Sequence, residues 1–430
     1  MGSAEQQAIS IDVDHNPYLA DGARTVDAIV SITARAGAAA PSAAALDRVE
    51  AIVIDCSTSM LSPATKFEAA KRATIAAVAE LVDGTHFTVV AGSHQAYPVF
   101  PADGLTMPAS AASKAAAVAA VEGLTPNGGT AMGVWLAYVC GVVARHPGAL
   151  AHAILLTDGK NEHETREELQ AKIAATAGTF TCDCRGVGTA WKVEELRAIS
   201  SALLGSVDIV ADPEDLAEDF AKMMRISMSK TIPDLTLRVW TPVGAGVRFV
   251  KQVAPTIVDL TDRRAESSAQ VGEYPLGAWG AEDRDYHIRV ELEPAAVGRE
   301  KLAARLSVVA AEQVLGEGQV NAIWTADTEM SSKISDRVAH YTGQVEMAQL
   351  IQEGLNARNN NDVATAAAKL RRALDLALES GNSEAVERIK KVIDVDERTG
   401  TARLRRNVAA ADEMALDARS TRTARVRKEP

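Results

Sequence analysis

Residues 49 to 60 read VEAIVIDCSTSM, and this stretch decides how the chain is interpreted. The run at 49–54 is mostly apolar and rich in β-branched residues, which predicts a buried strand. It leads directly into Asp55, Ser57 and Ser59, a D-x-S-x-S pattern that places three oxygen-bearing side chains in one loop. We therefore expect a buried strand whose carboxyl end opens into a polar site.

Around this strand, between residues 49 and 228, short β-rich segments alternate with helical patterns. This alternation predicts an α/β fold: a doubly wound, mostly parallel sheet with helices on both faces. The predicted strands are 49–54, 87–90, 97–100, 153–156, 180–184 and 207–210, and the predicted helices are 66–82, 110–121, one after Gly129, 165–177, one from Trp191, and 212–228. The strand at 97–100 follows its neighbour too closely for a helical crossover, so we expect it to pair antiparallel.

The segments on either side of this domain alternate apolar and polar residues, which predicts strands with one buried face. They are 9–13 and 26–33 before it, and 235–240, 247–253, 286–292, 302–310 and 319–324 after it. Neither flank is a complete sheet alone. We therefore expect residues 1–46 and 231–330 to build one β-sandwich, with the domain at 47–230 inserted between two of its strands.

The last hundred residues are of a different type. Apolar stripes at helical spacing predict a helical hairpin at 331–397, with a third short helix near its end. From 398 to 430 basic residues outnumber acidic ones, and we expect a basic, flexible tail.

Composition limits the possible functions of the 430-residue chain. Its formal net charge of -12 argues against nucleic-acid binding, which needs a cationic face. The amino terminus shows no secretory signal pattern, and the longest apolar stretch, 131–144, is shorter than the roughly 20 residues of a membrane span. Four scattered cysteines do not form a disulfide framework, so we expect a cytoplasmic protein with reduced thiols.

Two further polar groups follow other predicted elements of the sheet. Thr130 ends the sequence TPNGGT before an apolar helix, and Asp158 follows the fourth predicted strand in LLTDG. Ligands of open parallel sheets bind at the carboxyl ends of the strands, where these residues should meet Asp55, Ser57 and Ser59. Two carboxylates and three hydroxyls form a hard-oxygen site, so Mg²⁺ is the expected ion, with Mn²⁺ or Ca²⁺ as substitutes. Water or a ligand oxygen would complete the coordination.

These three motifs, in this order on this pattern of strands and helices, resemble a von Willebrand factor type A domain with an intact metal-ion-dependent adhesion site, of the bacterial and specifically actinobacterial type. The resemblance covers roughly residues 47 to 228. It implies that Ser57, Ser59 and Thr130 contact the metal, and that Asp55 and Asp158 bind it directly or through water. It also implies that a partner protein's Asp or Glu completes the coordination, and that the helix at 212–228 moves when the partner binds.

Simpler interpretations stand beside these. D-x-S-x-S alone can be an Asx-turn with helix-capping serines, although Thr130 and Asp158 at matching positions weaken that interpretation. Cys182 and Cys184 point to one face of a strand and can be a redox or soft-metal pair, but small core residues are the more common case. His94 and His163 lie near the predicted rim.

The function expected from the sequence is metal-dependent protein binding, with no enzymatic activity. A metal-dependent enzyme is the weaker alternative, because the chain shows neither a phosphate-binding loop with Lys nor a G-x-S-x-G motif, and carboxylates beside Cys56 oppose a thiolate. The other alternative is an accessory subunit of an ATPase in a chelatase-type complex.

Overall fold

The computed structural model describes residues 9–35, 46–396 and 398–426. The sequence prediction for the extreme amino terminus, 1–8, lies outside the described residues. The chain divides into two compact units: Met1–Ser42 together with Asp234–Pro430, and Ala43–Pro233 between them. The second unit is therefore inserted within the sequence of the first.

The inserted unit is built on one mixed sheet with the order β10-β9-β8-β4-β5-β6, and β7 also pairs with β5. Its strands are β4 (Arg48–Asp55), β5 (His86–Gly92), β6 (Ala96–Phe100), β7 (Met107–Pro108), β8 (Leu150–Thr157), β9 (Thr181–Val187) and β10 (Val207–Val210). The five strands from β10 to β5 are parallel, and β6 and β7 pair antiparallel with β5. β4 and β8 are central and buried along their length, which explains their nearly continuous apolar sequence.

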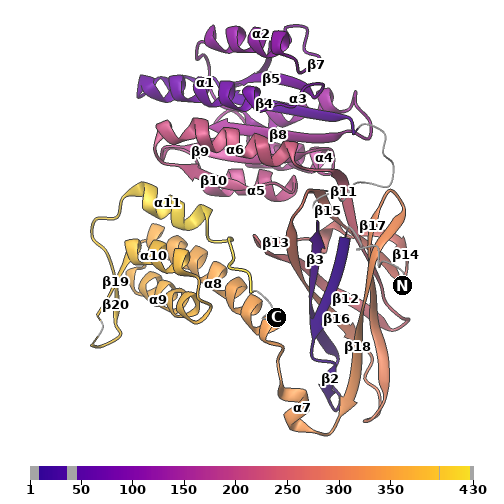
Figure 1. Ribbon diagram of the computed structural model, residues 1–430. Coiled ribbons are helices and arrows are strands. Elements are labelled where there is room, and N and C mark those ends of the chain that lie inside the picture. The colour runs from indigo at the N-terminus through magenta and orange to yellow at the C-terminus, as the bar shows by residue number, and fades with distance from the viewer. Residues whose placement is uncertain (1–8, 36–45, 397, 427–430) are drawn as a thin grey trace. The chain divides into compact units, whose positions relative to one another are not determined.

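Helices cover both faces of this sheet (Figure 1). On one face α1 (Ala64–Ala79), α2 (Ala111–Glu122) and α6 (Leu216–Met228) pack into a single apolar core with the strands. On the other lie α3 (Met132–Val143), α4 (Arg166–Thr176) and α5 (Val193–Ala202). The prediction of a doubly wound sheet is confirmed.

A buried polar cluster crosses the centre of this sheet. His152 of β8 lies with Nδ1 2.8 Å from Glu50 Oε2 of β4 and Nε2 3.0 Å from Asp183 Oδ2 of β9. Ser227 near the end of α6 donates to Glu50 Oε1 at 2.5 Å. Burial alone would lower the pKa of His152, but the two carboxylates outweigh it and raise that pKa to about 10. The imidazole is therefore a cation that joins three strands.

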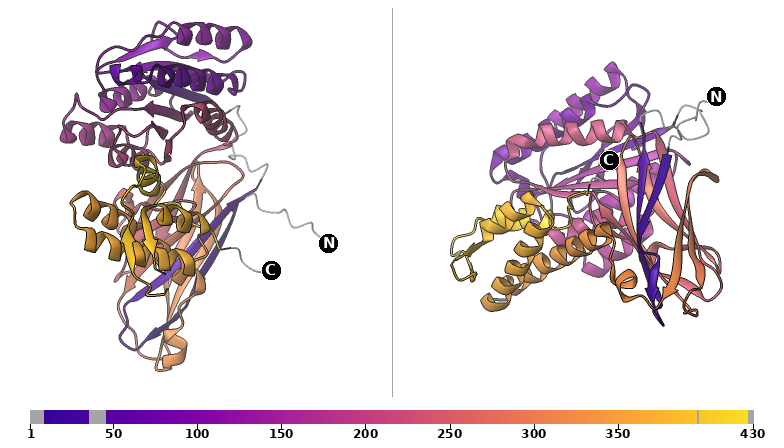
Figure 2. Two further views of the ribbon diagram at one scale, coloured as in Figure 1. Left: turned by 90° about the vertical axis from the view of Figure 1, so that its left-hand side faces the viewer. Right: turned by 60° about the horizontal axis from the view of Figure 1, so that its bottom comes forward.

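The first unit contains a β-sandwich. One sheet has the order β1-β3-β16-β12-β13 and the other the order β14-β15-β11-β17-β18-β2. Its strands are β1 (Ile9–His15), β2 (Tyr18–Ala20), β3 (Thr25–Ala34), β11 (Ile232–Trp240), β12 (Ala245–Ala254), β13 (Val258–Asp259), β14 (Ala265–Ser268), β15 (Val271–Trp279), β16 (Asp283–Leu292), β17 (Glu300–Ala310) and β18 (Gln313–Thr325). β3 pairs antiparallel with β16, and β2 pairs parallel with β18. Figure 2 shows the indigo amino-terminal strands lying among the pink-to-orange strands of the second flank, so both flanks build one sandwich.

Helices complete the first unit. α7 (Thr328–Ser332) leads into α8 (Asp336–Asn359), α9 (Val363–Glu379) and α10 (Ser383–Val392), followed by the strand pair β19 (Ile393–Val395) and β20 (Ala402–Leu404) and by α11 (Ala410–Ala418). α8 covers the outer face of the first sheet, because Val338 and Tyr341 pack with Ile29, Val253 and Ala254.

The segment from residue 398, expected from its sequence to be a flexible tail, is folded in its described part. Besides β20 and α11, it places Arg425 against the sandwich, with Nε 3.0 Å from Asp285 Oδ2 and Nη1 2.6 Å from Asp283 Oδ2. Asp285 is fully buried and also accepts from Arg337. The basic residues of this segment therefore include one that pairs with a buried acid, which a count of charges does not reveal.

Candidate metal centre

Three loops meet at the carboxyl end of the parallel sheet in the inserted unit. β4 ends in Asp55, Thr130 precedes α3, and Asp158 follows β8. Backbone hydrogen bonds join these loops. Thr58 N donates to the carbonyl of Gly128 at 2.9 Å, and His163 N, in the loop after β8, donates to the carbonyl of Thr130 at 3.1 Å. The backbone thus holds the three polar segments beside one another.

Four of the five predicted ligand residues are linked through a chain of short contacts. The fully buried Asp55 accepts from Ser57 N at 2.8 Å and from Thr157 Oγ1 at 2.6 Å. The hydroxyls of Ser57 and Ser59 are 2.8 Å apart, and Ser59 Oγ donates to Asp158 Oδ1 at 2.6 Å. Because the proton of Ser59 goes to Asp158, Ser57 is the donor between the two hydroxyls.

Thr130, the fifth predicted ligand residue, lies beside the same cluster. A Cβ added to Gly159 would be 3.1 Å from Thr130 Oγ1 and 3.3 Å from Ser59 Oγ, so both hydroxyls border this glycine. The loop after β8 also caps α3, since Asn161 Oδ1 and Glu164 Oε2 accept from its first two backbone N–H groups at 2.7 Å. These caps fix the start of the helix that follows Thr130.

The electrostatics of the cluster favour a bound cation. Burial, together with the nearby charge of Asp158, raises the pKa of Asp55 to about 6, although its hydrogen bonds act in the opposite direction. Burial and the charge of Asp55 raise the pKa of the Cys56 thiol to about 12. An ion between the two carboxylates would relieve their repulsion, whereas a Cys56 thiolate would add to it.

Sequence reasoning missed Lys66, which lies in the first turn of α1. Its Nζ is 2.5 Å from Asp158 Oδ2, and its side chain is mostly buried. A cation in the first turn opposes the helix dipole, so a lysine at this position is itself a sign of a carboxylate partner. Lys66 supplies one positive charge to the two carboxylates and orients Asp158.

The two histidines predicted near the rim pack over the glycine loop. A Cβ at Gly128 would lie 2.2 Å from His94 Nδ1, and one at Gly129 would lie 1.8 Å from the ring of His163. The two imidazole centroids are 6.0 Å apart, and both side chains are exposed. The Gly-Gly pair before Thr130 therefore leaves space for two rings at the edge of the site.

The residues present fit a hard divalent cation. The potential metal ligands are all oxygens, from two carboxylates and three hydroxyls, and the hydroxyls of Ser57 and Ser59 can exchange their mutual contact for contacts with an ion. Asp55, Ser57, Ser59, Thr130 and Asp158 are the residues that would hold it.

The fold and this site define a class of protein: an α/β domain with a cluster of carboxylate and hydroxyl side chains at the carboxyl end of its sheet. Comparison with known proteins gives the family. Residues 51–209 match the von Willebrand factor type A domain, and residues 375–420 match the von Willebrand factor type A C-terminal domain. The second match spans α10, β19, β20 and α11.

One solved structure, a von Willebrand factor type A protein from Catenulispora acidiphila, is 47% identical, covers 99% of both chains and superposes with a TM-score of 0.93. The chain therefore belongs to the von Willebrand factor type A family, and the predicted bacterial type is confirmed. The ArnB paralog VWA2 from Sulfolobus acidocaldarius shares the fold, with 12% identity, a TM-score of 0.61, and coverage of 96% of this chain and 98% of its own.

Among curated proteins, an uncharacterized protein of Synechocystis is 25% identical over 228 residues, which are 53% of this chain and 52% of that protein. The chain thus spans about half the length of this relative. Among the described residues, no helix combines the length and apolar character that a membrane crossing requires.

Proposed function

We propose that the inserted unit binds a divalent cation, with Mg²⁺ as the expected ion, and uses it to bind an acidic side chain of a partner protein. The observation that carries the proposal is the convergence of two buried carboxylates and three hydroxyls from three separate loops. Mn²⁺ and Ca²⁺ are possible substitutes in the same site.

The ligand set supports a role in binding. Mg²⁺ requires six oxygen ligands and the cluster offers five side chains, so with one oxygen from each at least one position is left for water or an oxygen from outside. A carboxylate of a partner is the strongest oxygen ligand that another protein can offer. The metal would supply a localised positive charge, and Lys66 and Thr157 would keep the two aspartates in place.

The rim offers contacts that one carboxylate cannot provide. Leu61, in the short 3-10 helix (Thr58–Leu61) that follows the serine loop, is an exposed apolar side chain with 54% of its surface accessible. His94, His163 and Lys160 are exposed around the same loops. An apolar anchor with polar groups around it is the composition of a small protein-binding surface.

The described residues support a binding role more than an enzymatic one. The buried Cys56 thiol has a pKa raised to about 12 and is a poor nucleophile at neutral pH. An accessory role in an ATPase complex remains the second candidate, because such a role uses the same metal-dependent contact with a partner protein.

We also propose a reducing, cytoplasmic location. All four cysteines are free, and the buried pair Cys182 and Cys184 has its sulfur atoms 3.9 Å apart without a disulfide. Unpaired thiols are typical of such a compartment.

The test is affinity capture from a native lysate in Mg²⁺, in EDTA, and in EDTA followed by excess Mg²⁺. Three baits are compared: wild type, Thr130→Ala, and Thr58→Ala, which changes a hydroxyl of the same loop that is absent from the proposed ligand set. The proposal predicts a partner that binds wild type and Thr58→Ala only with Mg²⁺ and is lost with Thr130→Ala. Capture of the partner that is unaffected by EDTA and by Thr130→Ala would contradict the proposal.

Adding wild type or Thr130→Ala to the purified partner and measuring the partner's ATP turnover then distinguishes the two binding roles. Turnover that wild type raises and Thr130→Ala does not raise identifies an accessory subunit. Unchanged turnover supports binding of a partner without a role in ATP hydrolysis.

A further inference from the structure

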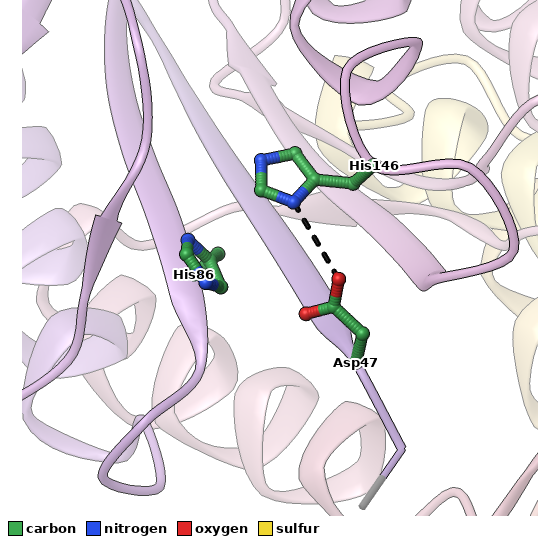
Figure 3. A group of neighbouring side chains, drawn as sticks. All are labelled: Asp47, His86 and His146. Atoms are coloured by element: carbon green, nitrogen blue, oxygen red, sulfur yellow. Dashed lines mark ion pairs between the residues drawn. The ribbon is translucent and has the colours of Figure 1, made fainter.

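Two histidines and an aspartate gather at the opposite end of the same sheet, at the amino ends of its strands. Asp47 immediately precedes β4, His86 begins β5, and His146 lies in the turn between α3 and β8. One ring nitrogen of each histidine and one carboxylate oxygen all lie within 4.8 Å of one another (Figure 3). These residues are separate from the oxygen cluster, which lies at the carboxyl ends of β4 and β8.

Backbone hydrogen bonds hold the segments that carry Asp47 and His146. Leu150 N donates to the carbonyl of Asp47 at 2.9 Å, and His146 N donates to the carbonyl of Val143 at 2.8 Å. The two imidazole centroids are 4.7 Å apart. His146 Nδ1 lies 3.6 Å from Asp47 Oδ2. Two ligand atoms of one tetrahedral zinc ion lie about 3.3 Å apart, so these two atoms need to move only slightly closer together to bind one ion.

One hydroxyl group, that of Thr106, contacts a ring nitrogen of both histidines. Thr106 Oγ1 lies 2.9 Å from His146 Nε2 and 3.2 Å from His86 Nδ1. Because a hydroxyl oxygen has two lone pairs, Thr106 can accept an N–H from both rings. In the neutral tautomer that fits this contact, the other nitrogen of each ring carries no proton, and this is the form that binds a metal. Metal-bound histidines commonly have an outer partner of this kind.

We propose that Asp47, His86 and His146 form a second cation site, selective for Zn²⁺ or a similar late transition metal. Imidazole nitrogen favours these ions over Mg²⁺, whereas the oxygen cluster favours Mg²⁺. Three protein ligands leave one tetrahedral position for water. A bound ion would tie the start of β4, where the chain enters this unit, to β5 and to the turn after α3.

The test is calorimetric titration of zinc chloride into the full chain in buffer with millimolar Mg²⁺, which keeps the oxygen cluster occupied. The same samples are titrated with Co²⁺, whose visible absorption reports tetrahedral coordination. The variants are His86→Gln with His146→Gln, and Asp47→Asn, whose exposed side chain makes a folding defect unexpected. The matched control is His94→Gln with His163→Gln, the other neighbouring pair of imidazoles.

Wild type should bind one Zn²⁺ and show tetrahedral Co²⁺ bands. The His86/His146 variant should lose both signals, Asp47→Asn should bind at least tenfold more weakly, and the control pair should bind as wild type. Thr106→Val should weaken binding about tenfold, the lower end of the effect of an outer partner. Zinc binding that survives in the His86/His146 variant, or that disappears only in the control pair, would overturn the proposal.

Discussion

The buried imidazole of His152 makes the stability of the inserted unit depend on pH in a defined direction. Its pKa is about 10 in the folded protein and 6.5 without the fold. A group with a raised folded pKa stabilises the fold fully below the unfolded pKa, and this stabilisation is lost as pH rises towards the folded pKa. The free energy of unfolding should therefore fall as pH rises from 7.

The size of this fall follows from the two pKa values. Between them the folded state holds one proton more than the unfolded state, so the slope approaches about 1.4 kcal/mol per pH unit. From pH 7.0 to 8.5 the free energy of unfolding should drop by about 2 kcal/mol. The buried thiols Cys56 and Cys182 also have raised pKa values, but their contribution begins only near pH 9, where the thiols of the unfolded chain lose their protons.

Urea titrations with pulsed hydrogen–deuterium exchange of β4 and β8 peptides measure this unit specifically. The control is His152→Gln, which removes the titrating ring and leaves a neutral side chain able to donate a hydrogen bond to Glu50. This variant should be less stable at pH 7, and its stability should be nearly constant from pH 7.0 to 8.5. The same slope in wild type and variant would refute the assignment of a charged His152.

Three further predictions concern the oxygen cluster and the first unit. Because metal binding needs ionised Asp55, whose pKa is about 6, Mg²⁺ affinity measured by calorimetry should be about tenfold weaker at pH 5 than at pH 7. Gly159→Ala should weaken Mg²⁺ binding about tenfold, because its Cβ would lie 3.1 Å from a ligand hydroxyl, whereas Gly141→Ala, with open space, should not. Arg425→Gln should cost the first unit about 1–3 kcal/mol in urea unfolding, because buried Asp285 loses a charged partner; an unchanged midpoint would contradict this.

Periodicity and turn residues were sufficient to predict the inserted unit. The apolar run of β4 is a central strand, and the helix predicted at 212–228 is present as α6, preceded by a short helical turn at Pro213–Asp215. Strand β15 was missed, because its sequence VGEYPLGAW contains two glycines and a proline, which are poor strand formers. Its buried Tyr274 and Trp279 were the available signal.

The candidate sites were also predicted only in part from the sequence. The motif residues are brought together as the strand order predicts, because strand ends in a parallel sheet meet at one edge. Lys66 and Thr157, which orient the two aspartates, were missed because the partner of each depends on three-dimensional geometry; the position of Lys66 in the first turn of α1 was the available signal. The same holds for His86 and His146, which are distant in the sequence and meet only through the order of the strands.

The central claim is that the oxygen cluster holds a divalent ion, and calorimetric titration of Mg²⁺ tests it most directly. Wild type, Thr58→Ala and the nearly isosteric Asp158→Asn are compared at pH 7.5, with far-UV circular dichroism as the check on folding. The account predicts one Mg²⁺ in wild type and in Thr58→Ala, and none in Asp158→Asn. Absence of binding in folded wild type, or equal binding in Asp158→Asn, would contradict it.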